Sequence, residues 1–200
     1  MPSDAMNAIF ADFAKLLESR LREQVLTTED SVRYTLFASL LNHNVELNSL
    51  ILEYPHPEIP RAQIDTWISE YYENSIAIEF KYDREKPGGK NQPKTQKAGS
   101  VFQDLFRLQL ANKNAMAVCY FIYLTDAEMH VYFKNPKNGH KELYELPQHS
   151  IFRMDKNYFS GKPKTFMSKL KEPFEASITS ILKRSLIGEH HLRIYRVEAA

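Results

Sequence analysis

The sequence predicts an α/β protein with a mixed central β-sheet flanked by helices, in the element order helix, three strands, helix, strand. Apolar residues recur at helical spacing on both sides of a group of strands. Residues 63–68 and 75–82 alternate apolar and polar side chains, and residues 115–124 form an apolar run typical of the middle of a sheet. The 200 residues, 43% of them hydrophobic, suffice for one core, so a single domain over residues 1–200 is expected.

Two helices are expected at the start of the chain. In residues 1–26, apolar side chains at three- and four-residue steps mark one buried stripe of an N-terminal helix. Thr27 or Thr28 can cap a second helix, which opens with Glu29 and ends near Asn42. An acidic residue in the first turn is favoured by the helix dipole.

Three strands follow, which we expect over residues 45–54, 63–68 and 75–82. A group of prolines separates the first strand from the second, because proline cannot continue a strand. The second and third strands are close enough to pair as a hairpin through residues 70–74.

The second half of the predicted core, which spans residues 27–134, contains a loop, a helix and two strands. Residues 83–99 are rich in Gly, Pro and Lys and are expected to form an exposed mobile loop. Ser100 can cap the helix that follows. The apolar strand 115–124 then pairs with a hairpin partner at 129–133.

Residues 135–200 are expected to form an extension packed on this core. The pattern predicts a polar loop near 135–149, a helix between about 166 and 186, and a last strand over 191–197.

Charge and cysteine content exclude some classes of protein. The 26 basic and 25 acidic residues give a net charge of +1, so the overall charge does not indicate a nucleic-acid or membrane partner. The lone Cys119 cannot form an internal disulfide and lies in an apolar run, so we expect a buried thiol in an intracellular, cytoplasmic protein. No apolar run approaches the roughly 18 residues of a membrane span.

The chemically informative feature is an acidic residue on one predicted strand and an acid and a lysine on the next. Glu79 and Lys81 project side by side on a non-core face, because residues i and i+2 share one face of a strand, while Phe80 enters the core. If the hairpin forms, Asp65 comes within reach of both. Two carboxylates and a backbone carbonyl, that of Phe80, are ligands that suit Mg²⁺.

At these residues the sequence resembles the PD-(D/E)XK nuclease superfamily. The resemblance rests on Ile64-Asp65, on the triplet Glu79-Phe80-Lys81 and on the order of elements over residues 29–133; Ile64 stands where the motif has proline. It implies a restriction-endonuclease-like three-layer core and an enzyme that hydrolyses phosphodiester bonds in nucleic acid, with Mg²⁺ or Mn²⁺ as cofactor. DNA is the expected polymer, in restriction, defence or repair.

The resemblance also implies roles for single residues. Asp65 and Glu79 would hold the metal, Lys81 would orient the attacking water or stabilise the transition state, and Glu29 would assist as an additional acid near the metal. Gln103 occupies a helix position where some members carry glutamine, although Arg107 stands where those members have tyrosine. Many members act as homodimers on duplex DNA.

A local basic patch lies beside the predicted site. Residues 81–100 contain six basic and two acidic residues, a local charge of +4 that would attract phosphates. With Gln103 and Arg107, the predicted nucleic-acid contacts are Lys86, Lys90, Lys94 and Lys97. The loop is equally well explained as a solvated linker.

Several alternatives remain open at this point. Glu79 and Lys81 can be a plain ion pair on a solvated face. The chain can be a catalytically inactive nuclease-fold module that binds nucleic acid or protein, or an enzyme that processes a nucleotide or small molecule. Glu53 can approach the metal or only flank a turn, and Trp67 can stack on a base or pack in the core.

Overall fold

The computed structural model describes residues 2–85, 91–170 and 172–200. It contains a seven-stranded mixed sheet with strand order β1-β2-β3-β4-β7-β6-β5, flanked by helices on both faces. The predicted α/β class with a mixed sheet is therefore confirmed. The helices are α1 (Pro2–Arg22), α2 (Glu29–Asn42), α3 (Lys94–Ala115), α4 (Ala127–Lys134), α5 (Lys141–Tyr144) and α6 (Lys164–Leu170). The strands are β1 (Leu50–Pro55), β2 (Gln63–Tyr71), β3 (Asn74–Asp83), β4 (Val118–Thr125), β5 (Ile151–Met154), β6 (Ala176–Ser185) and β7 (His191–Ala199).

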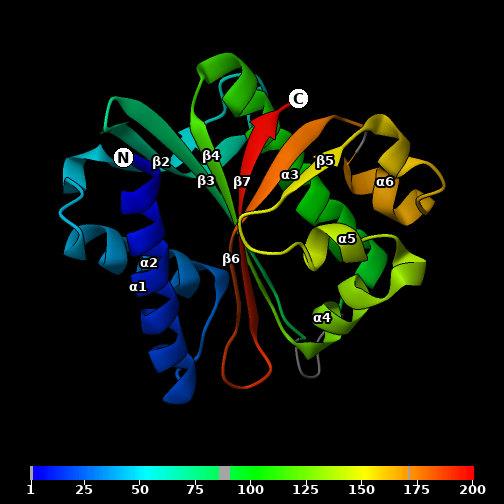
Figure 1. Ribbon diagram of the computed structural model, residues 1–200, viewed down its shortest axis with the longest axis horizontal. Helices are drawn as coiled ribbons and strands as arrows, with labels where there is room; N and C mark the ends of the chain where they lie inside the picture. Colours follow the sequence, from blue (N-terminus) through cyan, green and yellow to red (C-terminus); the bar gives the residue numbers. More distant parts are fainter. Residues whose placement is uncertain (1, 86–90, 171) are drawn as a thin grey trace.

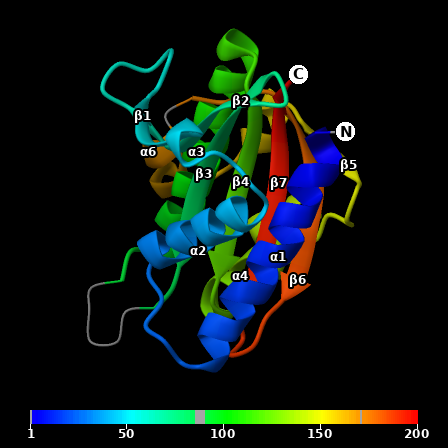
Figure 2. The same cartoon turned by 90° about the vertical axis from the view of Figure 1, so that its left-hand side faces the viewer.

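The helices form two layers on opposite faces of the sheet. Helices α1 and α2 cover one face, and α3 to α6 lie on the other (Figures 1 and 2). Each layer has its own hydrophobic core. On the α1–α2 side, Phe10 and Phe13 pack with Ile78 and Phe80 of β3. On the α3 side, Phe102 and its neighbours pack with the opposite face of the same strands.

The strand pairing includes one crossover connection, between β3 and β4. β1, β2 and β3 form an antiparallel meander, and β3 pairs with β4 in parallel. The connection between these parallel strands contains α3, as a parallel pair requires. β4 lies in the middle of the sheet, as its continuous apolar run predicted, with β7 on its other side.

The second helix begins as expected. The Thr28 side chain accepts a hydrogen bond from the Ser31 amide at 3.2 Å, which makes Thr28 the N-cap, and Glu29 lies in the first turn. Thr27 instead donates to the Val25 carbonyl. This cap fixes the position of Glu29 at the end of α2 that faces β3.

Helix α3 begins seven residues earlier than predicted, because its N-cap is Pro93 and not Ser100. Residues 94–99 are therefore helical rather than part of a loop, and Lys97 is only 6% exposed. At Gly99 of the same turn, a Cβ atom would lie 2.4 Å from the Phe166 carbonyl oxygen of α6. The close approach of α6 thus requires glycine.

Three other predicted elements are wrong. Residues 129–133 belong to helix α4, which the Asp126 side chain caps by accepting from the Met129 amide. The predicted helix over 166–186 is the short helix α6 followed by strand β6, because Pro173 interrupts the chain and β6 alternates buried and half-buried side chains. Residues 47–49 form a 3₁₀ turn before β1 rather than the start of a strand.

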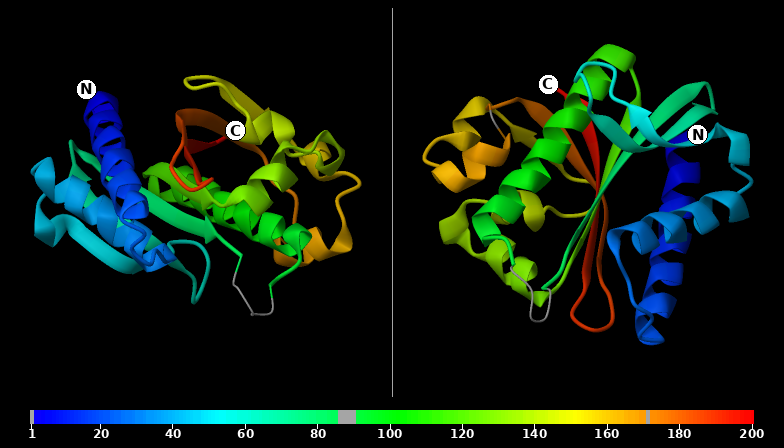
Figure 3. Two further views of the ribbon diagram at one scale, coloured as in Figure 1. Left: turned by 90° about the horizontal axis from the view of Figure 1, so that it is seen from below. Right: turned by 180° about the vertical axis from the view of Figure 1, so that it is seen from behind.

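The C-terminal residues complete the central sheet. Strands β6 and β7 form a long hairpin, and β7 pairs with β4 along its whole length. The short strand β5 forms the far edge (Figure 3). β3 therefore has four strands on one side, β4, β7, β6 and β5, and only β2 and β1 on the other.

Candidate functional site

The predicted acidic residues meet where β2 separates from β3. The antiparallel ladder pairs Trp67 with Ala77 and Thr66 with Ile78, and the recorded pairing stops there. The next position along this register brings Asp65 opposite Glu79. Beyond it β2 continues along β1, so one side of β3 is left without a neighbouring strand.

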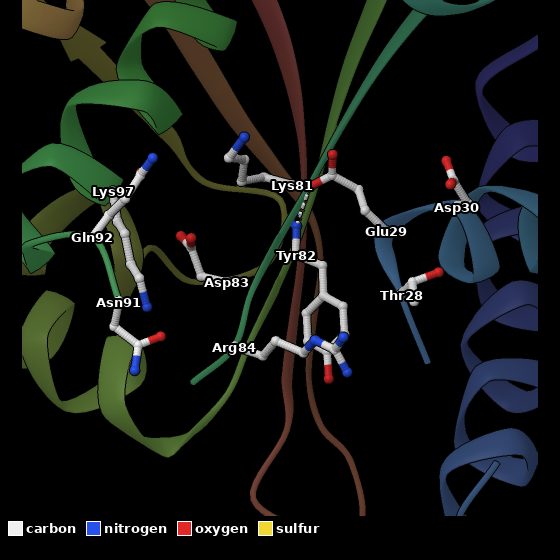
Figure 4. Close-up of a pocket in the computed structure, with 10 residues that line it drawn as sticks. All are labelled: Thr28, Glu29, Asp30, Lys81, Tyr82, Asp83, Arg84, Asn91, Gln92 and Lys97. Carbon is white, nitrogen blue, oxygen red and sulfur yellow. Dashed lines mark hydrogen bonds between the residues drawn. The ribbon is translucent and has the colours of Figure 1, made fainter. Parts of the chain in front are cut away.

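Two carboxylates take the place of the missing strand. Asp65 Oδ2 accepts a hydrogen bond from the Phe80 amide at 2.8 Å. Glu29 Oε2 accepts one from the Tyr82 amide, also at 2.8 Å (Figure 4). The amide and the carbonyl of one residue point to the same side of an extended strand. The carbonyl of Phe80 therefore faces the same gap as the Asp65 carboxylate.

Glu79 lies at the bottom of this gap and is only 1% exposed. The sequence predicted that Glu79 lies on a non-core face. This prediction is wrong, because α3 packs on this side of β3 and buries the side chain. The Arg107 guanidinium lies 2.9 Å from Glu79 Oε1, but its angle is not that of a hydrogen bond, and this oxygen has no hydrogen-bond donor among the described residues. Burial raises the pKa of Glu79 well above its usual range, and the charges of Asp104 and Asp65 add to the rise while Arg107 opposes it.

Asp65 is neutralised from the other side of the gap. Arg33 of α2 bridges Asp65 Oδ1 at 3.1 Å and Glu53 Oε1 at 2.7 Å. Glu53 therefore acts through Arg33, and its side chain is 48% exposed. Neither of the two readings of Glu53 from the sequence had included this arginine.

Lys81 extends from β3 beside these acids. Its ammonium lies 3.9 Å from Asp104 Oδ2. Burial alone would lower the pKa of Lys81, but the charges of Asp104 and Glu29 outweigh it, so the pKa is raised. The amine is therefore protonated at neutral pH. In Figure 4 Lys81 and Glu29 approach β3 from opposite sides.

Asp104 is a member of the cluster that the sequence analysis missed. It contacts both Lys81 and Arg107 Nη1, the latter at 3.4 Å, and burial raises its pKa to about 7. A signal for it exists in the sequence, because Asp104 lies on the same helical stripe as Val101 and Leu108, both buried. A carboxylate at a core position of a helix requires a partner.

Two cavities adjoin the cluster. One, of about 540 Å³, is lined by Glu29, Lys81 and Lys97 among others (Figure 4). The other, of about 720 Å³, is lined by Asp65, Gln103 and Arg107. Gln103 and Arg107 thus lie beside the predicted metal ligand Asp65.

The predicted basic contacts divide into two pairs. Lys86 and Lys90 lie outside the described residues. Lys94 and Lys97 both lie on α3 and both contact Glu128 of α4, at 3.3 and 3.4 Å. Their charges are partly neutralised within the protein.

Two other open alternatives are decided by packing. Trp67 is 7% exposed and stacks on Tyr54, with ring centroids 4.6 Å apart, so it belongs to the core. Cys119 is buried, as expected, and burial raises the pKa of its thiol. It lacks the electropositive, open setting of a nucleophile.

The residues at the gap fit a hard divalent cation in kind. Asp65, Glu79 and the Phe80 carbonyl offer only oxygen atoms, which Mg²⁺ and Mn²⁺ prefer. Glu79 Oε1 lacks a hydrogen-bond donor among the described residues, and the pKa of Glu79 is raised by burial first and by the nearby charges of Asp104 and Asp65 second. In residues 2–85, 91–170 and 172–200, however, no three His, Cys, Asp or Glu side chains form a group that could hold a metal ion. A site would therefore consist of two carboxylates and a carbonyl.

Within the described residues, every helix is too short or too polar to cross a membrane. Comparison of the chain with protein-family models, with curated proteins and with solved structures gave no match.

Proposed function

We propose that the chain is a metal-dependent nuclease that hydrolyses phosphodiester bonds in nucleic acid, with DNA as the expected polymer. The observation that carries this proposal is the convergence of Asp65, Glu79, Glu29 and Lys81 at the point where β2 leaves β3. We further propose a restriction-endonuclease-like core. The succession α2, β1, β2, β3, α3, β4, with β4 parallel to β3, supports it.

The proposed metal ligands are Asp65, Glu79 and the carbonyl of Phe80. A bound Mg²⁺ or Mn²⁺ would lower the pKa of its water and offset negative charge at phosphorus. The Asp65 carboxylate is held in place by the Phe80 amide and by Arg33, so its side chain has little conformational freedom. This preorganisation favours binding of a cation without rearrangement of the strand.

Lys81 is proposed to act as a cation. Because the neighbouring carboxylates raise its pKa, the ammonium is a hydrogen-bond donor and stabilises negative charge on a phosphate oxygen in the transition state. Neither of the two roles that the resemblance implied needs a proton removed from the amine, because an ammonium can also orient the attacking water by donating a hydrogen bond. Asp104 contacts the ammonium at 3.9 Å, and the charge of Glu29 adds to the rise of its pKa.

The test is incubation with supercoiled DNA, single-stranded DNA and RNA, each in Mg²⁺, in Mn²⁺ and in chelator. The variant is Glu79→Gln, because glutamine removes the charge but keeps the side-chain size and one carbonyl oxygen at this buried position, whereas alanine would leave a cavity. A bound metal lowers the activation barrier by several kcal/mol, so its loss in this variant should reduce the cleavage rate by about 10³-fold or more. Glu175→Gln, an exposed glutamate before β6, is the matched control and should cleave normally. Absence of cleavage of all three polymers by the wild type would contradict the enzyme.

A specific observation favours a second candidate, a catalytically inactive nuclease-fold module that binds nucleic acid or protein. Arg33 and Arg107 already neutralise Asp65 and Glu79 within the protein. A titration with Mn²⁺ separates the two candidates. Binding that is lost in Asp65→Asn favours the nuclease, and no binding at any accessible concentration favours the module. Homodimerisation and a cytoplasmic location stay predictions.

A further inference from the structure

Arg107 has an unusual set of contacts for an arginine at a buried acid. Its guanidinium contacts Glu79 at 2.9 Å, Asp104 at 3.4 Å and the backbone carbonyl of Gln63, while its Nε has no hydrogen-bond partner among the described residues. The contact with Glu79 lacks hydrogen-bond geometry. Arg107 therefore neutralises Glu79 by charge more than by a directed hydrogen bond.

The position of Arg107 allows it to move. Its side chain is 20% exposed and lines the cavity of about 720 Å³ that also contains Asp65 and Gln103. Glu79 behind it is almost fully buried. The guanidinium thus lies between the acid and open space, and it can leave Glu79 without disturbing β3.

The opposite arginine is held differently. Arg33 binds Asp65 and Glu53 at 3.1 and 2.7 Å, both as hydrogen bonds, and its side chain is only 11% exposed. Of the two arginine–carboxylate contacts at the gap, that of Arg107 with Glu79 lacks hydrogen-bond geometry and has the more open side, although Arg107 also donates to Asp104 and to the Gln63 carbonyl. A cation that arrives at the gap would therefore exchange with Arg107 rather than with Arg33.

We propose that Arg107 is an exchangeable counter-ion of Glu79, which a divalent cation displaces toward the adjoining cavity, so that Arg107 is a positioning residue that sets the metal affinity of the site. The inference rests on the proposed function, because it takes Glu79 as a ligand. The divalent cation and the Arg107 guanidinium are both positive, so they cannot both contact the buried Glu79 carboxylate without a large repulsion. Each Mn²⁺ bound therefore has to overcome the existing contact with Arg107.

The experiment is a calorimetric titration of the full chain with Mn²⁺ alone. Arg107→Gln should bind Mn²⁺ about tenfold more tightly than the wild type, because the competing charge is gone. Arg153→Gln removes the same charge from an exposed position on β5 and should leave the affinity unchanged. Equal or weaker binding by Arg107→Gln would overturn the inference.

A second measurement separates competition from a structural role. In chelator, Arg107→Gln should melt at a lower temperature than the wild type, since Glu79 loses its counter-charge, and saturating Mn²⁺ should raise its melting temperature more than that of the wild type. A purely structural arginine would lower the melting temperature equally with and without Mn²⁺, and that result also overturns the inference. If Arg107→Gln does not fold, Arg107→Met decides, because methionine fills part of the same space without the charge, and this variant should also bind Mn²⁺ more tightly than the wild type.

The possible failures are distinguishable. Unchanged Mn²⁺ affinity in Arg107→Gln together with cleavage by the wild type would remove the counter-ion role and leave the nuclease in place. Raised affinity without cleavage of any polymer would support the counter-ion role and remove the nuclease. Absence of Mn²⁺ binding in every variant would overturn both.

Discussion

Two clusters of buried charge lie on the same face of the sheet, two strands apart, and they are built differently. In the Arg193 cluster, the guanidinium of Arg193 donates to the carbonyls of Tyr144 and Leu192, contacts Glu145 at 3.4 Å and lies 4.6 Å from the Tyr144 ring centroid. In the Glu79 cluster, Glu79 and Arg107 each have an atom without a hydrogen-bond partner in the described residues. Tyr123, in register with both Lys81 and Arg193, separates the two clusters.

The difference appears in the direction of the pKa shifts. Lys183 and Arg193 outweigh the partial burial of Glu145, so the pKa of Glu145 is lowered. Burial and mutual repulsion dominate around Glu79 and Asp104, whose pKa values are raised. An ion pair that serves the fold satisfies its acid, whereas the Glu79 cluster keeps an excess of acid. The following predictions test this contrast.

The largest expected effect comes from breaking the satisfied cluster. Arg193→Met should lower the free energy of unfolding by about 3–5 kcal/mol, since Arg193 is only 2% exposed and its removal leaves buried acceptors without a donor. Glu79→Gln should change it by less than about 1 kcal/mol, because it removes a charge that burial already disfavours. Urea unfolding in chelator measures both, and equal losses in the two variants would erase the contrast.

Metal addition should act on one cluster only. Mn²⁺ at about 100 times its dissociation constant should raise the free energy of unfolding by about 2.7 kcal/mol. We expect this gain to disappear in Glu79→Gln and to persist in Arg193→Met, where the ligands are intact. Thermal unfolding with and without chelator makes the comparison. A gain that persists in Glu79→Gln would place the cation elsewhere.

The two clusters should also give pH dependences of opposite sign in metal-free protein. The raised pKa of Asp104, about 7, means that the folded state holds a proton that the unfolded chain has released, so stability falls as pH rises from about 4 to 7. The lowered pKa of Glu145 contributes stability that is present above its unfolded pKa and is lost as pH falls through its folded pKa. Asp104→Asn should therefore flatten the stability curve between about pH 4 and 7 by on the order of 1 kcal/mol. Glu145→Gln should leave that window unchanged, and an unaltered curve in Asp104→Asn would contradict the assignment.

The smallest effect is expected at a solvent-accessible pair. Lys94 contacts Glu128 with its side chain 47% exposed, so Lys94→Gln should change the free energy of unfolding by less than about 1 kcal/mol. If Lys94 contacts a phosphate, as the sequence predicted, the same variant should reduce the salt dependence of DNA binding by about one unit of slope. Fluorescence anisotropy at several salt concentrations measures this slope. An unchanged slope would mean that Lys94 pairs with Glu128 and contacts no phosphate.

The sequence predicted the parts of the fold and site that depend on strand alternation. Asp65, Glu79 and Lys81 were brought together by the period of two and by one hairpin, which local pattern determines. The short apolar segment at 129–133 was ambiguous, and the Asp126 cap decided for a helix. Arg107 and Asp104 reach β3 through the packing of α3, which no local pattern contains. The burial of Glu79 depends on the same packing.

The length of the turn between β2 and β3 determines whether Asp65 and Glu79 lie opposite each other. Asp65 and Glu79 face each other only because the chain reverses at Tyr72 and Glu73, both with positive φ. Insertion or deletion of one residue there would slide one strand by about 3.3 Å and turn its side chains to the other face. The hairpin loop, although distant from the acids, therefore sets their alignment through its number of residues.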